Sequence, residues 1–272
     1  MIHIDHLKKS YDSFTLECSL DIPKGVITGI VGMNGAGKST LFKSILGINP
    51  IDEGNIQIPD KQDIGVVLSE TGFSEFFTVS DIISILKCTY KRFDKDLFHS
   101  YCQRFDIPLD KKTRTFSTGM KAKLNIIIAL THHAQLLILD EPTAGLDVLT
   151  RDEILDILRD YMEKEDCTIL ISSHISGDLE SLCDDLYVID HGHMIMHEEM
   201  DTLLSLYGVL KVSKEDYETL DKDYLLAVLE EPFGYSCLTN EKQFYSENYP
   251  AIVIEQNHID TMIPILLKGE RI

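Results

Sequence analysis

The sequence has 272 residues, of which 44% are hydrophobic and 26% are charged, and its formal net charge is -20 at pH 7. This length and composition are typical of a globular protein with one large core, or with a large and a small domain. The acidic charge argues against a surface that follows the phosphates of a nucleic acid or an anionic lipid layer.

Apolar stretches in the sequence are short. Even 126–130, one of the longest uninterrupted runs, is far below the ~20 residues of a membrane helix. No basic-then-apolar leader opens the sequence. If the protein works at a membrane, we expect another chain to span it. The six cysteines show neither a C-x-x-C pair nor a metal-ligand spacing, which favours small buried thiols.

The first 46 residues predict a hairpin, a buried strand and a helix. Apolar and polar residues alternate over 1–7 and 14–20, which favours two half-exposed antiparallel strands. The apolar run 26–31 is typical of a central strand, and a helix is expected over 41–46. Between them lies Gly32-Met33-Asn34-Gly35-Ala36-Gly37-Lys38-Ser39-Thr40, which fits the G-x-x-x-x-G-K-[ST] phosphate-binding loop.

This loop has the chemistry that a nucleotide phosphate needs. Its glycines let backbone N–H groups turn inward around an anion, and the N-terminus of the following helix adds partial positive charge. Lys38 would reach the β- and γ-phosphates, and the Ser39 hydroxyl would bind Mg²⁺. The loop predicts nucleotide binding but does not distinguish a kinase, a GTPase and an ATPase.

The middle of the chain predicts strands over 55–58 and 64–68, a helical stretch from 79 to about 104, and a long helix capped by Ser117. Before the first helix, three phenylalanines lie close together in a polar loop. They are either core anchors or a surface for a partner. These residues are Phe73, Phe76 and Phe77.

Two acids end the next predicted strand, 136–139. Asp140 can hold Mg²⁺ beside Ser39, directly or through water. Glu141 is one residue further and points elsewhere, toward a water that attacks the γ-phosphate; the alternative is a plain surface acid. The sequence has no Asn-Lys-x-Asp tetrad, which disfavours a GTPase.

The remaining elements complete an α/β pattern. A helix is expected over 148–164, a buried strand over 168–171 that leads to His174, and an antiparallel pair over 186–189 and 194–197. The alternation predicts a mostly parallel sheet covered on both faces. After about Gly208 we expect a small α+β appendage with helices over 211–231 and 257–267 and strands over 235–239 and 251–255.

Taken together, these motifs occur in the order and spacing of an ABC-transporter ATP-binding subunit; they are 32–40, 117–121, 137–141, 144–147 and His174. The resemblance covers about the first 208 residues. The run Phe-Ser-Thr-Gly-Met-Lys-x-Lys-Leu and the run Leu-Asp-Glu-Pro-Thr-Ala-Gly-Leu-Asp are most similar to bacterial exporter-type subunits of the YtrB and bacitracin-exporter kind.

The resemblance implies a P-loop NTPase fold of ABC type. This fold has a mixed sheet core, an antiparallel β subdomain and a helical subdomain at about 70–133. The ATP-binding domain would occupy 1–208, and 209–272 would form a small C-terminal accessory domain.

The resemblance also implies roles for single residues. Tyr11 matches the aromatic that stacks on adenine; the alternative is a packed tyrosine at a strand end. The phosphate loop matches at Gly32, Asn34, Gly35, Ala36, Gly37, Lys38, Ser39 and Thr40. Ser117 and Gly119 match the motif that contacts the γ-phosphate bound to a second copy, and Asp147 matches the loop that links both sites. His174 matches the residue that touches the γ-phosphate and steadies Glu141, so Glu141, His174 and Lys38 would carry catalysis.

The sequence departs from the family pattern at two places. The usual glutamine after strand 64–68 is missing, and Ser69 or Glu70 stands there. We expect Glu70 to replace it as a further Mg²⁺ group. In the 117–121 motif, Thr118 stands in place of glycine and Met120 in place of glutamine.

The resemblance implies a cytoplasmic ATPase, peripheral at the inner face of the membrane, with ATP and Mg²⁺ as cofactors. It would dimerise around two ATP molecules, with a second copy or a paralogue, and drive a separate transmembrane permease; no nucleic acid partner is expected. The three phenylalanines would face the permease. One alternative is a soluble ABC-type ATPase that remodels a protein complex. Another is a regulatory binding module that no longer hydrolyses ATP. The presence of Asp140, Glu141 and His174 disfavours this alternative.

Overall fold

The structure is a computed structural model that describes residues 2–68, 72–164, 166–255 and 258–272. The chain forms two compact units. The first contains Met1–His174 and Tyr187–Met196, and the second contains Ile175–Leu186 and His197–Ile272. The domain boundary expected after residue 208 stays a prediction. Across the part of the chain that the structure describes, no helix has both the length and the apolar character to cross a bilayer.

A three-stranded antiparallel sheet begins the first unit, with the order β2-β1-β4. Its strands are β1 (Ile2–Tyr11), β2 (Phe14–Ile22) and β4 (Glu53–Gln57). The register pairs Ile4 with Leu20. The predicted hairpin is confirmed, although both strands are longer than expected. Its core-facing side chains meet α1 (Lys38–Ile45), whose Leu41, Phe42 and Ile45 are fully buried.

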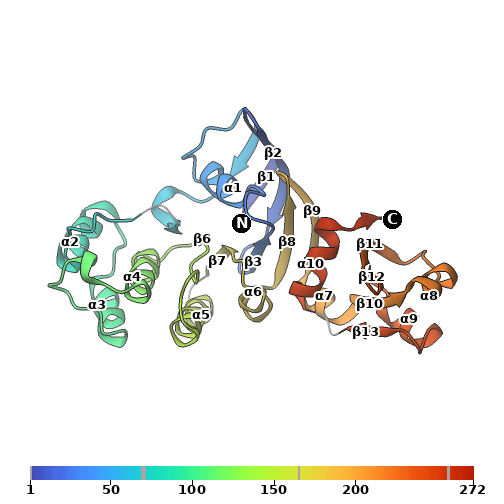
Figure 1. The fold of residues 1–272 in the computed structure, drawn as a ribbon. Coiled ribbons are helices and arrows are strands. Elements are labelled where there is room, and N and C mark those ends of the chain that lie inside the picture. Colours follow the sequence, from blue (N-terminus) through green and yellow to red (C-terminus); the bar gives the residue numbers. More distant parts are fainter. Residues whose placement is uncertain (1, 69–71, 165, 256–257) are drawn as a thin grey trace. The chain divides into compact units, whose positions relative to one another are not determined.

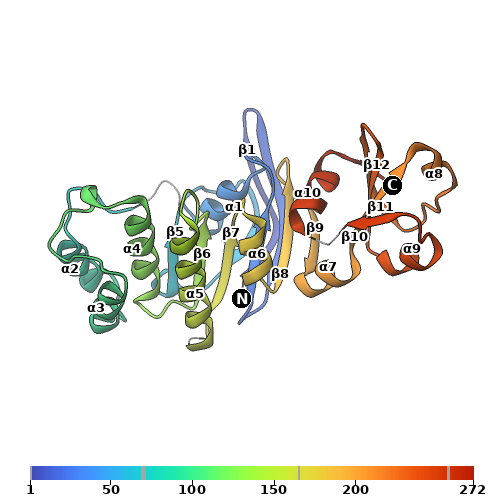
Figure 2. The same ribbon diagram turned by 60° about the horizontal axis from the view of Figure 1, so that its bottom comes forward.

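A second, six-stranded sheet has the order β5-β6-β7-β3-β8-β9. Its strands are β3 (Ile27–Val31), β5 (Ile64–Val67), β6 (Leu136–Asp140), β7 (Thr168–Ser172), β8 (Asp185–Asp190) and β9 (His193–Glu199). The pairs β5–β6, β6–β7 and β7–β3 are parallel, and Figure 2 shows β5, β6 and β7 side by side. Every residue of β3, β6 and β7 is buried, which explains their nearly continuous apolar sequences.

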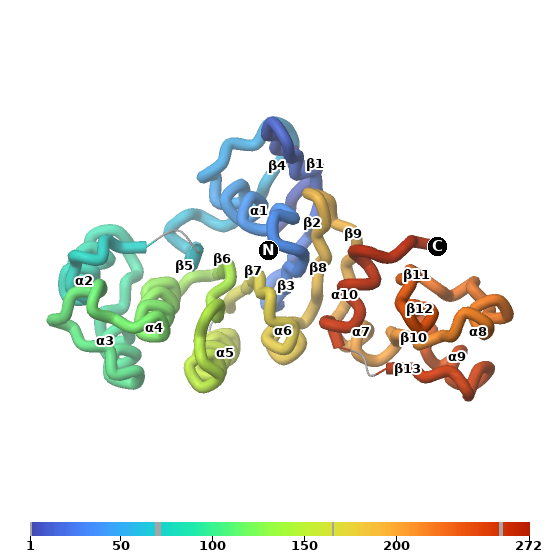
Figure 3. Tube along the Cα trace, viewed as in Figure 1, coloured from blue at the N-terminus to red at the C-terminus, as the bar shows by residue number. Residues whose placement is uncertain are grey.

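Three helices follow β5 and gather into a group that Figure 3 shows on the trace: α2 (Val79–Thr89), α3 (Lys95–Arg104) and α4 (Thr118–Leu130). The helical stretch predicted from 79 to about 104 is two helices, because Asp94 caps a new one by accepting from the Leu97 N–H at 2.8 Å. Ser117 caps α4 as predicted. Short 3₁₀ turns occupy Lys61–Asp63 and Thr113–Thr115, and α5 (Val148–Lys164) lies between β6 and β7 in the chain.

His132, just beyond α4, is buried and has a depressed pKa. Its Nε2 donates to the Ile64 carbonyl at 3.1 Å, and its ring stacks on Tyr90 with centroids 4.0 Å apart. Burial lowers the pKa of this imidazole below the ordinary value of 6.5, since the charged ring would lose its hydration.

We therefore expect the free energy of unfolding to fall as the pH drops below 6.5. The unfolded chain then binds a proton at His132 that the folded chain does not, which contributes a slope of at most about 1.4 kcal/mol per pH unit. Urea unfolding between pH 5 and pH 7.5 measures this effect. The curve of His132→Gln, which keeps a donor for Ile64, should be flatter than that of the wild type. Parallel curves would contradict the assignment.

The second unit contains a five-stranded antiparallel sheet with the order β13-β10-β12-β11-β14. Its elements are β10 (Gly208–Ser213), α8 (Lys214–Thr219), β11 (Leu225–Glu231), β12 (Gly234–Thr239), α9 (Lys242–Asn248), β13 (Val253–Glu255), α10 (Ile259–Lys268) and β14 (Glu270–Arg271). The first six follow the β-α-β-β-α-β order of a ferredoxin-like fold, and α10 and β14 are additions. Two helices precede the sheet, α6 (Ser176–Leu182) and α7 (Met200–Leu206).

The sheet of this unit carries helices on both faces. A cluster with Leu210, Val212, Cys237 and Tyr245 buries one face against α8 and α9. The alternate residues Val209, Ala227 and Leu238 are also buried but face the other way. Helix α10 contacts β10, β11 and β12 and buries Ile259, Met262 and Ile265, so it covers this second face.

The predicted α+β character of this region is confirmed, but the helix expected over 211–231 is wrong. That stretch contains the end of β10, the short α8 and β11. Helix-favouring residues such as Lys, Glu and Leu are common there. Pairing of β10 and β11 with β12 decides the structure instead. The strand over 235–239 and the final helix are confirmed within two residues, whereas α7 and α9 were not predicted.

Candidate functional site

The phosphate loop lies between β3 and α1, and its glycines are required by its surroundings. A Cβ on Gly32 would lie 2.2 Å from the Ile189 carbonyl oxygen. Gly37 has φ +118°, and a Cβ there would lie 2.9 Å from Cζ of Phe14. One cavity is lined by Phe14, Asn34, Gly35, Gly37, Lys38, Ser39, Thr40, Asp140 and Glu141. The structure thus brings the predicted phosphate loop and both acids together.

Lys38 starts α1 and is buried beneath the loop. Its Nζ donates to the Gly32 carbonyl at 2.7 Å and to the Met33 carbonyl at 3.4 Å. These two contacts hold the ammonium group across the loop, at the N-terminus of α1. A phosphate in the cavity would therefore meet a fixed positive charge together with the helix dipole.

Asp140 is 2% exposed, and two serine hydroxyls hold its carboxylate. Ser39 Oγ donates to Oδ2 at 2.7 Å, and Ser172 Oγ donates to Oδ1 at 2.8 Å. The register of β6 and β7 pairs Asp140 with Ser172, which explains the second contact. Ser172 was not among the predicted site residues, although its place as a polar residue at the end of a buried strand was a signal in the sequence.

The hydroxyl of Ser39 and the carboxylate of Asp140 form an oxygen donor set of the kind that Mg²⁺ prefers, together with phosphate oxygens and water. The two residues therefore fit the predicted metal site. Ser69 and Glu70 lie outside the residues that the structure describes, so the metal role of Glu70 stays a prediction.

Glu141 and His174 form a hydrogen-bonded pair. Glu141 Oε2 accepts from the backbone N–H of His174 at 3.0 Å and from its Nδ1 at 2.5 Å. Because a carboxylate only accepts, Nδ1 of His174 carries the proton in this hydrogen bond. The backbone N–H of Glu141 donates to the carbonyl and the hydroxyl of Ser172, both at 3.1 Å, and its φ is +54°. Asp140 and Glu141 both line the Lys38 cavity, and the role of Glu141 toward an attacking water stays a prediction.

Gly119 and Asp147 both lie beside Thr150 in the first turn of α5, and Ser117 caps α4. Asp147 accepts from the Thr150 N–H at 3.0 Å and from its hydroxyl at 2.9 Å. These bonds, the backbone one first, hold the pKa of the Asp147 carboxyl below its usual value. A Cβ on Gly119 would lie 3.1 Å from Cγ2 of Thr150. The lining of the Lys38 cavity consists of other residues, so this group forms a separate surface of the first unit.

Phe14 lies beside the phosphate loop, and Tyr11 is its neighbour. Tyr11 ends β1 with its ring exposed, and its hydroxyl accepts from Nδ2 of Asn49 at 3.1 Å. Its ring centroid is 6.4 Å from that of Phe14, which lines the cavity. The alternation over 14–20 predicts only a half-exposed strand at Phe14 and no part in the site. Its contact with Gly37 depends on tertiary structure and has no local signal.

Comparisons with known proteins show which family the chain resembles. The model of the family "ABC transporter" matches residues 16–144, and a model described as an AAA domain, putative AbiEii toxin, type IV TA system, matches residues 112–177. The chain is 30% identical over 242 residues to the ABC transporter ATP-binding protein YtrB of Bacillus subtilis (strain 168), covering 85% of this chain and 81% of YtrB.

A second relative and a solved structure point to the same family and fold. The chain is 33% identical over 211 residues to the lantibiotic transport ATP-binding protein SrtF of Streptococcus pyogenes, covering 74% of this chain and 92% of SrtF. Its fold is similar to that of an ATP binding subunit of an ABC transporter, with a TM-score of 0.68, 24% identity, and coverage of 75% of this chain and 91% of that one. From this likeness and the phosphate site, the chain belongs to the family of ABC transporter ATP-binding proteins and is an ATPase.

Proposed function

We propose that this ATPase energises export through a separate membrane-spanning permease. The observation that carries the proposal is the arrangement of Glu141 and His174 at the end of the Lys38 cavity, in a chain whose relative SrtF is a lantibiotic transport protein. The arrangement of these two residues supports ATP hydrolysis, and the likeness to transport proteins supports export as the process that hydrolysis drives.

Each residue in or beside the cavity has its own role in hydrolysis. Lys38 binds the β- and γ-phosphates, and Glu141 takes a proton from the attacking water. His174 donates through Nδ1 to Glu141 and thereby fixes the direction of the carboxylate. Ser39 and Asp140 would hold Mg²⁺, which neutralises charge on the phosphates when it is bound.

The second half of each site would come from another ATP-binding subunit, either a second copy or a paralogue. Ser117 caps α4 at its N-terminus, which favours an anion such as a γ-phosphate. Beside Asp147, the apolar side chains of Val148 and Leu149 are 60% and 77% exposed, as expected of a surface that a partner covers. ATP would join the two subunits, and loss of the γ-phosphate would release them.

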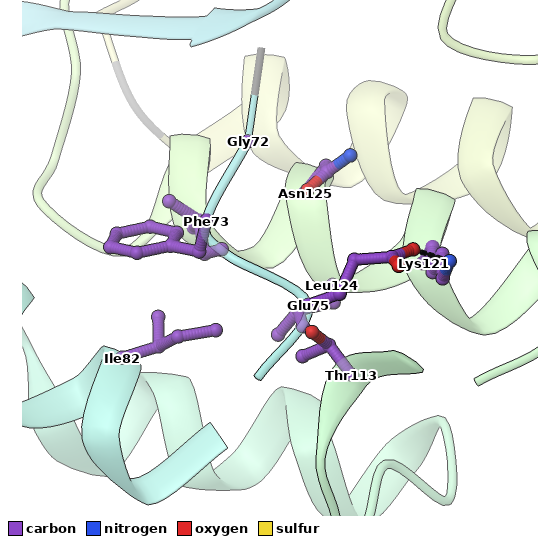
Figure 4. A pocket seen from close by; sticks show the side chains of 9 residues that line it. Gly72, Phe73, Glu75, Ile82, Thr113, Lys121, Leu124 and Asn125 are labelled. Carbon is purple, nitrogen blue, oxygen red and sulfur yellow. Dashed lines mark hydrogen bonds and ion pairs between the residues drawn. The ribbon is translucent and has the colours of Figure 1, made fainter. Parts of the chain in front are cut away.

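The three phenylalanines differ in their exposure. Phe73 is half-buried and lines a pocket with Ile82 and Leu124, which Figure 4 shows together. Phe76 is 67% exposed and Phe77 is also exposed. Glu75, between them, accepts from Lys121 Nζ at 2.5 Å and fixes the loop against α4. An exposed aromatic pair on a fixed loop suits a segment of a membrane partner.

We expect the Phe76→Ala, Phe77→Ala double variant to lose most of its membrane association. Truncating these rings removes exposed apolar anchors and leaves the core intact, whereas Phe73→Ala would also open the pocket. The measurement is the fraction of tagged chain that sediments with membranes of the native host. Phe233→Ala, an exposed phenylalanine in the second unit, is the matched control.

Two outcomes would contradict the proposal. Retention of the double variant on membranes at the wild-type level would remove the phenylalanines from the permease surface. Absence of the wild-type chain from membranes, together with a stable complex with a non-membrane protein, would favour the ABC-type ATPase that remodels a protein complex. Cytoplasmic placement at the inner face of the membrane belongs to the same proposal and is tested by the same fractionation.

A further inference from the structure

Helix α6 begins directly after the catalytic histidine that we propose. Only Ile175 separates His174 from Ser176, the first residue of α6. Two consecutive Cα–Cα steps span at most about 7.6 Å. Any element that fixes the start of α6 therefore limits where the backbone of His174 can lie.

Helix α10 of the second unit fixes α6 through polar contacts. The Ser176 hydroxyl donates to Asp260 Oδ1 in the first turn of α10. Glu180 Oε1 accepts from the Ile259 N–H at 2.6 Å, and Glu180 Oε2 accepts from His258 Nδ1 at 3.1 Å. We call these five residues, Ser176, Glu180, His258, Ile259 and Asp260, the α6–α10 latch.

The latch satisfies groups that would otherwise lack partners at a helix end. Ile259 is the first residue of α10, and its N–H has no acceptor within the helix. The carboxylate of Glu180 supplies that acceptor and places a negative charge at the positive end of the helix. Ser176 is buried, so its contact with Asp260 also fills the hydrogen-bonding need of a buried hydroxyl.

Helix α10 is itself attached to the ferredoxin-like sheet in two ways, by packing and by the strand that follows it. Its side chains Ile259, Met262 and Ile265 are buried, and it contacts three strands of the sheet. Directly after it, β14 pairs with β11 through Arg271 and Ala227. These contacts fix α10, and through the latch also α6, within the second unit.

We propose that the α6–α10 latch positions His174 for hydrolysis, so that the C-terminal ferredoxin-like region controls the turnover of the ATPase. Ser176, Glu180 and Asp260 are positioning residues, because they act through His174. This inference rests on the role of His174 in the proposed function. Its readout is the hydrogen bond from the His174 N–H to Glu141.

The first test compares Asp260→Ala with Asp260→Asn. Alanine removes the acceptor of Ser176, whereas asparagine keeps an Oδ1 in the same place. We expect Asp260→Ala to lower kcat by about 10- to 100-fold with KM for ATP unchanged, since misplacement of a catalytic group acts on the transition state. Asp260→Asn should recover most of this loss. Glu230→Gln, which weakens the exposed Lys214–Glu230 pair of the same unit, is the control.

A second measurement is amide hydrogen exchange at His174. Its N–H should exchange faster in Asp260→Ala than in the wild type or in Glu230→Gln, because the bond to Glu141 opens more often. This readout needs no turnover. It separates a displaced His174 from a general loss of the fold, which would speed exchange at buried amides of β7 as well.

The outcomes distinguish this inference from the proposed function. If His174→Ala hydrolyses ATP like the wild type, the proposed role of His174 is wrong. If His174→Ala is slow but Asp260→Ala keeps the wild-type kcat and the wild-type exchange at His174, the latch inference is overturned. If it is correct, adding Asp260→Ala to His174→Ala should cause no further loss, because both changes act on one group.

Discussion

Glu141→Gln should slow ATP hydrolysis by about 10²- to 10⁴-fold and leave ATP binding intact. Glutamine has the size of glutamate and keeps an oxygen that accepts from the His174 N–H, but its amide cannot take a proton from water. The cavity around Lys38 would stay complete, because the other residues that line it are unchanged. Phosphate release and equilibrium binding of ATP, measured on one preparation, separate the two properties.

The same variant tests whether ATP joins two subunits. With hydrolysis slowed, the γ-phosphate persists, so ATP and Mg²⁺ should convert monomers to dimers in light scattering. Glu163→Gln, an exposed acid near the end of α5, is the matched control and should hydrolyse ATP normally. A Glu141→Gln protein that binds ATP and stays monomeric would mean that an unlike subunit supplies the second half. Unchanged hydrolysis would remove Glu141 as the base.

Lys38→Ala should weaken ATP binding by about 10- to 150-fold. A charge-assisted hydrogen bond to phosphate contributes about 1.5–3 kcal/mol, and this ammonium group is held in place before the nucleotide arrives. Calorimetric titration with ATP measures the effect. Lys24→Ala removes an equal charge from the exposed Lys24–Asp166 pair and should bind ATP like the wild type. Equal affinities of the two variants would show that Lys38 does not reach the phosphates.

Much of the site was predictable, because its residues follow one another in the chain. The sequence places Lys38 at the start of a helix after a glycine loop, and Asp140 and Glu141 at the end of a buried strand. Backbone geometry alone then sets their directions. The structure adds what joins them: the Asp140–Ser172 register of β6 and β7, and the contact of Phe14 with Gly37. Both depend on segments far apart in the sequence.

The C-terminal region was less predictable for the same reason. Its strands are short, and each pairs with a partner that arrives after a helix or a turn. Leu225 and Val228 have the spacing of a helix face, yet they lie in β11 and pack in the cluster that contains Tyr245. When several elements share one small core, pairing with distant strands outweighs local propensity.

The left-handed backbone of Glu141 has a consequence for how this protein can be made more robust. At φ +54°, the Cβ of a non-glycine residue costs about 1–2 kcal/mol of folding free energy. Glycine has no Cβ and avoids this cost. A search for variants that survive heating would therefore favour glycine at this position and discard the carboxylate. Glutamate at position 141 thus lowers the folding stability but supplies the base that we propose. Thermal stability and turnover therefore oppose each other at this position.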